Sequence, residues 1–111
     1  MLTIGSIQLA SRLIVGTGRY ADLEQMRACH QAAETNFVTV ALRRVDLDAP
    51  EGLNILDFID RKTIHLLPNT AGCYTAEDAI TTARMGRELL GTDLIKLEVI
   101  GDERTLFPDV P

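Results

Sequence analysis

The sequence predicts an α/β fold with a parallel sheet, made of four strand–helix units that follow a short N-terminal β-hairpin. Apolar, β-branched runs alternate with helical patterns, and the predicted strands begin near residues 12, 37, 64 and 94. These starts are 25, 27 and 30 residues apart, and one unit of a (β/α)8 barrel takes roughly 30 residues. An open doubly wound sheet has the same spacing, so periodicity alone leaves both architectures open.

Local signals place the elements along the chain. Two short alternating runs flank Gly5-Ser6, a two-residue turn signal that predicts the hairpin. Asp22 is suited to cap the first helix, Thr75 opens a pattern that resembles a capping box, and Gly91 is expected to end the last helix. We expect strands at residues 12–18, 37–44, 64–70 and 94–100, with Pro68 ending the third, and helices at residues 22–34, 54–61 and 75–91.

The composition argues against several classes of protein. The formal net charge of −5 disfavours a general nucleic-acid surface. No apolar run approaches the ~20 residues that span a bilayer, and the N-terminus lacks the basic start and long apolar core of a signal peptide. Cys29 and Cys73 stand far apart, which predicts neither a disulfide nor a metal site. We expect a soluble, reduced, cytoplasmic protein whose residues 1–111 form a single domain, with no membrane partner.

Residues 16–21, "GTGRYA", begin like the glycine pattern of a dinucleotide-binding turn after the first strand. Ala21 stands where the last glycine of G-x-G-x-x-G belongs. A dinucleotide site is therefore the weaker interpretation, and no cofactor is expected.

Polar side chains recur where the predicted strands end, which is the end that carries the chemistry in parallel α/β folds. Arg43 ends the second strand, Asn69 and Thr70 end the third, and Lys96 and Glu98 lie on the fourth. Arg43 suits a phosphate or a carboxylate, or else a surface salt bridge. Asn69 and Thr70 are candidates for the lining of a substrate pocket, although turn and cap roles explain them nearly as well.

The segment "LIKLEVI" (94–100) places two charges on an apolar strand. Its period of two puts Lys96 and Glu98 on one face and Ile95, Leu97 and Val99 on the other. If the apolar face packs on helices, the two charges point into a barrel interior, where desolvation favours a neutral, nucleophilic amine. The carboxylate beside it is placed for general acid–base work. A plain Lys–Glu ion pair that fills the interior explains the two residues equally well.

Four segments carry a resemblance to a known family. They are "SRLIVGTGRY", "TVALRRVDL", "LLPNTAGCYTAEDAITTAR" and "LIKLEVIGDERTLFPD". Together they resemble the N-terminal half of bacterial thiazole synthase, in register from Met1 to about Asp109. The combination of "LLPNTAGC-TAE-A" with "IKLEVIGD" is specific to that family.

The resemblance implies a fold and a reaction. The fold is the first four units of a (β/α)8 TIM barrel, preceded by a short N-terminal β-hairpin. Lys96 stands where the family lysine forms an imine with 1-deoxy-D-xylulose 5-phosphate, and Glu98 stands where a glutamate acts in the later proton transfers. A small ubiquitin-like sulfur carrier protein brings sulfur as a C-terminal thiocarboxylate, and dehydroglycine comes from a separate producing enzyme. No metal or nucleotide is implied on this subunit.

The resemblance covers one half of a barrel. The family's later aspartate and its glycine-rich phosphate loops have no counterpart before Pro111, so the 111-residue chain alone is expected to be inactive. Unpaired edges at the first and fourth strands predict association with another chain, as a homo-oligomer or with a second half. A fragment of a longer chain is the third explanation and the favoured one. Another lysine Schiff-base lyase and a non-catalytic half-barrel stay open as alternative functions.

Overall fold

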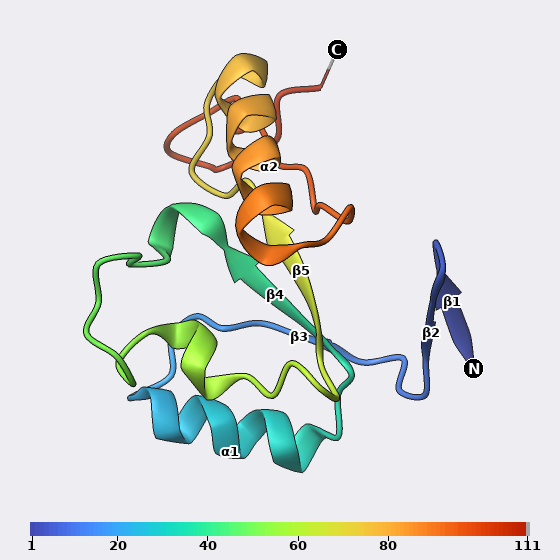
Figure 1. Cartoon of the computed structure of the whole chain (residues 1–111). Coiled ribbons are helices and arrows are strands. Elements are labelled where there is room, and N and C mark those ends of the chain that lie inside the picture. The colour runs from blue at the N-terminus through green and yellow to red at the C-terminus, as the bar shows by residue number, and fades with distance from the viewer. Residues whose placement is uncertain (111) are drawn as a thin grey trace. The chain divides into compact units, whose positions relative to one another are not determined.

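A computed structural model describes residues 1–110 and shows a mixed α/β fold (Figure 1). The chain divides into two compact units, which are described separately. The first comprises Met1–Thr39 and Val45–Leu66, and the second comprises Val40–Arg44 and the residues from Leu67 onward. The prediction of a single domain stays a prediction.

The first unit begins with a two-stranded antiparallel sheet. Strand β1 (Leu2–Ile4) pairs with β2 (Ile7–Leu9) across a two-residue turn, in which Gly5 has a φ of 60°. Glycine takes this left-handed conformation without steric cost, so the turn and its sequence agree. The pair joins Leu2 to Leu9 and Ile4 to Ile7.

A second, three-stranded sheet has the order β3–β4–β5, with β3 at Ile14–Val15, β4 at Phe37–Ala41 and β5 at His65–Asn69. Strand β3 runs parallel to β4, with Ile14 opposite Phe37. The sequence predicted a longer first strand, at residues 12–18, in an apolar run typical of a buried strand. That prediction is wrong, because Ile14 is 42% exposed at the sheet edge and the strand has only two residues.

Helix α1 (Leu23–Ala33) begins and ends where its capping signals predict. The Asp22 carboxylate accepts a hydrogen bond from the Gln25 N–H at 2.7 Å, and the Gln25 side chain accepts one from the Ala21 N–H. This reciprocal arrangement satisfies two backbone donors that a helix start otherwise leaves unpaired. The helix buries Met26 and His30, and Figure 1 shows it alongside the short 3-10 helix η2 (Ile55–Phe58) of the same unit.

The second unit holds helix α2 (Ala76–Leu90) together with the 3-10 helix η1 (Leu42–Arg44). The Thr75 hydroxyl caps α2 by accepting from the Asp78 N–H at 3.1 Å, and Gly91 ends it with a φ of 65°. Both predicted helix limits are confirmed. The residues from 42 to 44 were predicted to extend the second strand, whereas the structure turns them into η1.

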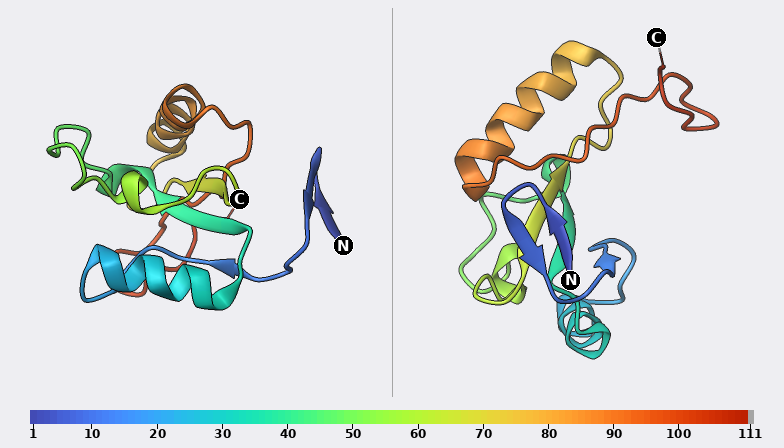
Figure 2. Two further views of the ribbon diagram at one scale, coloured as in Figure 1. Left: turned by 60° about the horizontal axis from the view of Figure 1, so that its bottom comes forward. Right: turned by 90° about the vertical axis from the view of Figure 1, so that its right-hand side faces the viewer.

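The predicted fourth strand is largely absent. Residues 94–100 pair with β5 through a single parallel bridge between Asn69 and Lys96. Figure 2 shows the chain leaving α2 and passing β5 before its last loop. The four-unit prediction therefore reduces, in the described residues, to an α/β fold with three parallel-sheet strands and two α-helices.

Pro68 explains one limit of this ladder. In a regular parallel register, residue 68 would donate its N–H to the Leu94 carbonyl, and proline has no N–H. The prediction that Pro68 ends the third strand is wrong, since β5 continues to Asn69. The Pro68 carbonyl still accepts the Lys96 N–H at 2.8 Å, so proline shortens the neighbouring segment instead of its own strand.

No helix among residues 1–110 combines the length and the apolar character that crossing a membrane requires.

Candidate active site

The predicted site residues all belong to the second unit and gather where β4 and β5 end. Arg43 lies in η1 directly after β4, Asn69 is the last residue of β5, and Thr70 follows it. The bridge between Asn69 and Lys96 brings the segment with Lys96 and Glu98 beside this end of β5. The carboxyl ends of parallel strands are where α/β folds bind ligands.

Lys96 and Glu98 form an ion pair. Lys96 Nζ lies 3.5 Å from Glu98 Oε1, so the predicted shared face is present. The two side chains are 49% and 37% exposed. The prediction that burial desolvates the lysine is wrong for this structure, because about half of its side chain meets solvent. The pair is open to a ligand from solution, and exposed pairs of this kind contribute little stability of their own.

The opposite face of the segment also differs from its prediction. Leu97 is 64% exposed, whereas Ile95 and Val99 are half-buried. The sequence predicted that all three pack on helices. No helix follows Leu90 in the described residues, so no helix from that part of the chain packs on the Leu97 side chain.

Thr70 is fully buried and binds the backbone of Glu98 in both directions. Its hydroxyl donates to the Glu98 carbonyl and accepts from the Glu98 N–H, each at 2.7 Å. The sequence predicted that Thr70 lines a pocket or serves in a turn or cap, whereas its hydroxyl bonds the backbone of a residue 28 positions away. The hydroxyl has one proton, and that proton is already donated to protein.

Asn69 is 6% exposed and shapes the turn after β5. Its Oδ1 accepts from the Ala71 N–H at 3.1 Å, an Asx turn that mimics a backbone turn. Since this bond uses the carbonyl side of the amide, a role of Asn69 in substrate binding stays a prediction that concerns its NH₂ group.

Arg43 reaches the same loop from η1. Its Nη1 donates to the Gly72 carbonyl at 2.7 Å, and its side chain packs where a Cβ on Gly72 would point. Gly72 also has a φ of 89°, which side chains rarely adopt. The guanidinium therefore braces the loop after β5, and its predicted contact with phosphate or carboxylate stays a prediction.

One carboxylate in this unit has a perturbed pKa. The backbone N–H groups of Arg104 and Thr105 donate to Asp102 Oδ1 at 2.8 and 3.3 Å and hold the pKa of that carboxyl below its usual value. Asp102 therefore organises the loop after the Lys96–Glu98 segment. Within residues 1–110, no group of three or more His, Cys, Asp or Glu side chains has the arrangement that a metal ion needs.

Comparison with known proteins places this site in a family. The family model described as "Thiazole biosynthesis protein ThiG" matches residues 3–111 of the chain. The chain belongs to the ThiG family. This confirms the resemblance that the four sequence segments indicated.

Curated relatives of this ThiG-family chain carry the name thiazole synthase. The thiazole synthase of Solibacter usitatus is 56% identical over 108 residues, and that of Rhodopirellula baltica is 57% identical over 114 residues. Each alignment covers 97% of the chain, but only 42% and 40% of the relatives. The chain thus spans about two fifths of the length of the curated relatives that it matches.

A solved structure of a similar chain exists in the BexX/CysO complex of Amycolatopsis orientalis. The match has a TM-score of 0.73 and 29% sequence identity, and it covers 97% of this chain and 44% of the other. The ThiG-family chain therefore resembles this solved structure in both sequence and fold.

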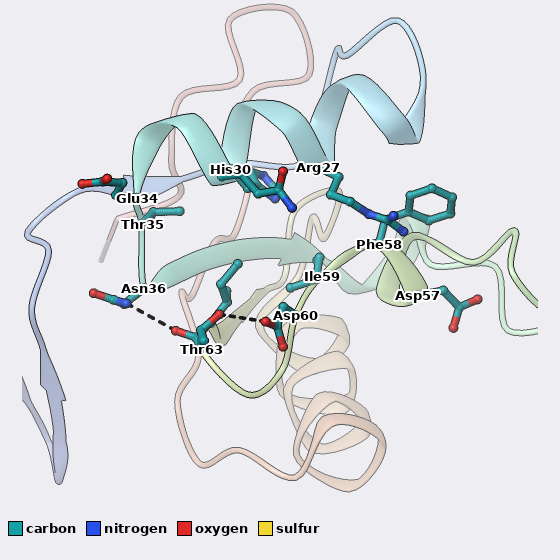
Figure 3. A pocket seen from close by; sticks show the side chains of 12 residues that line it. Arg27, His30, Glu34, Thr35, Asn36, Asp57, Phe58, Ile59, Asp60 and Thr63 are labelled. Atoms are coloured by element: carbon teal, nitrogen blue, oxygen red, sulfur yellow. Dashed lines mark hydrogen bonds between the residues drawn. The ribbon is translucent and has the colours of Figure 1, made fainter.

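A separate pocket lies in the first unit, between α1 and the residues from 57 to 64 (Figure 3). It encloses about 470 Å³ and includes Asn36, which precedes β4 and so lies at the amino end of that strand. Arg27 stacks over the Phe58 ring at 4.5 Å to its centroid, across the pocket wall. None of the predicted site residues lines it. The pocket of this unit therefore lies at the amino end of β4.

Sequence reasoning missed two supports of the site, the Thr70 clamp on Glu98 and the Arg43 bond to Gly72. These contacts join residues 28 and 29 positions apart, so no local pattern reports them. The available signal was Thr70 itself, a polar residue at the end of a buried apolar run.

Proposed function

We propose that this chain supplies the imine-forming lysine of a thiazole synthase, with 1-deoxy-D-xylulose 5-phosphate as the ketone substrate. The observation that carries the proposal is the Lys96–Glu98 pair, held 3.5 Å apart at the carboxyl end of β5 in a chain of the ThiG family. An amine and a carboxylate at this separation suit imine formation followed by proton transfer.

The first step joins Lys96 to the substrate ketone. The neutral amine attacks the carbonyl carbon, and the resulting carbinolamine loses water to leave a C=N bond. The amine first releases its proton to solvent, and the carbinolamine hydroxyl takes up a proton from solvent as it leaves as water, so neither transfer uses the Glu98 carboxylate. The half-exposed lysine leaves room for the ketone to reach Nζ.

The second step uses the imine as an electron sink. Glu98 removes the proton from the carbon next to the imine, and the electron pair of that C–H bond moves toward nitrogen to give an enamine. The carboxylate is then protonated and returns the proton in a later step. Dehydroglycine and sulfur complete the ring with loss of water.

The proposal includes a protein partner that delivers sulfur as a C-terminal thiocarboxylate. The similar chain BexX has been crystallised with CysO, which supports a protein–protein complex for this chain as well. We also propose that a separate enzyme produces the dehydroglycine, and that the full assembly contains several copies of the chain.

Reductive trapping tests the imine. The chain is incubated with 1-deoxy-D-xylulose 5-phosphate and borohydride, and peptide mass mapping locates the adduct. The same assay is run on a chimera in which this chain replaces the matching part of the Solibacter usitatus thiazole synthase. We expect modification of Lys96, lost in Lys96→Ala and kept in Lys62→Ala.

Lys62 is the matched control because it is the only other lysine. Mapping separates both lysines from the amine of Met1. If neither the folded chain nor the folded chimera gains an adduct on Lys96, the imine proposal is wrong and a non-catalytic half-barrel is favoured. An adduct with many unrelated ketones, but no thiazole from the chimera, favours another lysine Schiff-base lyase.

The role of Glu98 has its own readout. In Glu98→Gln the imine still forms, while deuterium uptake from D₂O at the carbon next to the imine falls by roughly 10²- to 10⁴-fold, the usual worth of a positioned general base. Unchanged deuterium uptake in this variant rules out Glu98 as the base.

A further inference from the structure

The bond pattern between β5 and residues 94–100 breaks off where Glu98 should continue it. The Lys96 N–H donates to the Pro68 carbonyl at 2.8 Å, and the Thr70 N–H donates to the Lys96 carbonyl at 3.3 Å. In a regular parallel ladder, the Glu98 N–H would next donate to the Thr70 carbonyl, and its own carbonyl would accept from the N–H of residue 72. Neither bond forms, because the chain turns away after Thr70.

The Thr70 carbonyl is already taken by this turn. It accepts from the Cys73 N–H at 3.1 Å, which closes the loop after β5. Glu98 would then have an unpaired N–H and an unpaired C=O on its backbone, at a half-buried position. Unpaired backbone groups away from water are costly.

The Thr70 side chain replaces both missing partners. Its Oγ1 accepts from the Glu98 N–H and donates to the Glu98 carbonyl, at 2.7 Å in both cases. Only a hydroxyl is small enough for a fully buried site and also able to donate and accept at one atom. The Thr70 side chain thus supplies the two hydrogen bonds of Glu98 that the backbone of the parallel ladder does not form.

We infer that Thr70 is a positioning residue for the Lys96–Glu98 pair. Its hydroxyl bonds backbone atoms of Glu98, and it acts by holding that backbone in the register that places Oε1 3.5 Å from Lys96 Nζ. The next backbone bonds along the segment are those of the Val99 carbonyl, which accepts from the Asp109 N–H, and of the Ile100 N–H, which donates to the Cys73 carbonyl, both at 2.8 Å. Without the hydroxyl, the N–H and the carbonyl of Glu98 itself have no hydrogen-bond partner, although the peptide groups before and after Glu98 keep theirs. This inference rests on the proposed function only in its catalytic consequence.

Two substitutions separate the hydroxyl from the volume of the side chain. Thr70→Val keeps the shape and removes both bonds, while Thr70→Ser keeps the bonds and removes a methyl group. Each lost bond is worth roughly two- to tenfold in an equilibrium constant. We therefore expect amide exchange at Glu98, measured by NMR in the chain, to accelerate at least about tenfold in Thr70→Val and to stay within a few-fold of wild type in Thr70→Ser.

The catalytic consequence is measured in the same variants. Deuterium uptake next to the imine, which depends on Glu98, is expected to fall about tenfold or more in Thr70→Val and to recover in Thr70→Ser. Trapping of the imine on Lys96 should change much less, because the Thr70 hydroxyl bonds the backbone of Glu98 and not that of Lys96. A loss shared equally by trapping and deuterium uptake would indicate general destabilisation.

Thr35→Val is the matched control for stability. Thr35 is also buried, and its hydroxyl also bonds backbone in both directions, accepting from the Phe37 N–H at 3.1 Å and donating its one proton to the Leu13 or the Phe37 carbonyl. This variant should lose a similar free energy of unfolding while Glu98 exchange relative to global unfolding and deuterium uptake stay near wild type.

The readouts distinguish the two proposals. If wild type forms no imine, the proposed function fails, while amide exchange at Glu98 still tests the clamp. If Glu98 exchange and deuterium uptake are unchanged in folded Thr70→Val, or if Thr35→Val reproduces both changes, Thr70 is not a positioning residue.

Discussion

Gly86→Ala tests the packing of α2 on η1, the 3-10 helix that carries Arg43. Gly86 lies on the buried face of α2, where a Cβ would stand 2.6 Å from Leu42 Cδ1, 3.4 Å from Cδ2 and 3.5 Å from Cγ. Carbon atoms attract best at roughly 3.5–4.0 Å, so the first contact overlaps by about 1 Å. Leu42 opens η1 and precedes Arg43, which braces the loop after β5.

Two terms of opposite sign decide the result. Alanine is better than glycine inside a helix by about 1 kcal/mol, whereas overpacking costs about 1–3 kcal/mol, even though the half-buried Leu42 side chain can relieve part of the clash by moving its Cδ1. We expect Gly86→Ala to lower the free energy of unfolding by about 1 kcal/mol. In a Leu42→Ala background the clash is gone, so Gly86→Ala should raise the free energy of unfolding by about 1 kcal/mol.

Urea unfolding followed by circular dichroism gives all four corners of this double-mutant cycle. The expected coupling energy between the two positions is about 2 kcal/mol. The reasoning is refuted if Gly86→Ala stabilises the wild-type chain, or if its effect is the same with leucine and with alanine at position 42.

Three further predictions concern local structure. The N–H groups of Arg104 and Thr105 hold the pKa of Asp102 below its ordinary 3.8, so its support of the loop is complete above that value and is lost as the pH falls through the lowered pKa. In an NMR titration, the amide signals of Arg104 and Thr105 should shift together below pH 3.8, and in Asp102→Asn they should show no such step. A midpoint at or above pH 3.8 would contradict a lowered pKa of Asp102. Thr75→Ala should lower the free energy of unfolding by about 1 kcal/mol through the lost cap, while Thr75→Ser keeps it; equal losses exclude the cap. Gly91→Ala should lower the free energy of unfolding by about 1–2 kcal/mol, because its φ of 65° strains a residue with a Cβ. No atom lies within 4 Å of the new Cβ, so this strain is the only cost expected. An unchanged thermal unfolding would be incompatible with this conformation.

The shortened fourth strand has one physical explanation at each end. Pro68 removes the donor that Leu94 needs, and the turn after Thr70 removes the acceptor that Glu98 needs. The outcome is a segment fixed at Lys96 by backbone bonds and at Glu98 by a side chain. This leaves the lysine and the glutamate on an open, half-exposed face.

The two α-helices and the family could be predicted from the sequence alone. The caps of α1 and α2 depend on residues no more than four positions apart, so Asp22, Thr75 and Gly91 specify them locally. The shared face of Lys96 and Glu98 follows from the period of two of an extended chain. The family segments, which span nearly the whole chain, pointed to thiazole synthase before any geometry was known.

The tertiary structure decided what local pattern does not contain. It showed Lys96 half-exposed instead of buried, Leu97 facing solvent, and the Thr70 hydroxyl bound to the Glu98 backbone. Each of these depends on which distant segment lies beside the residue, and the Thr70–Glu98 contact joins positions 28 apart. The sequence by itself determined which groups do the proposed chemistry, while long-range hydrogen bonding decided how those groups are held, because a donor and an acceptor far apart in the chain meet only in the folded state.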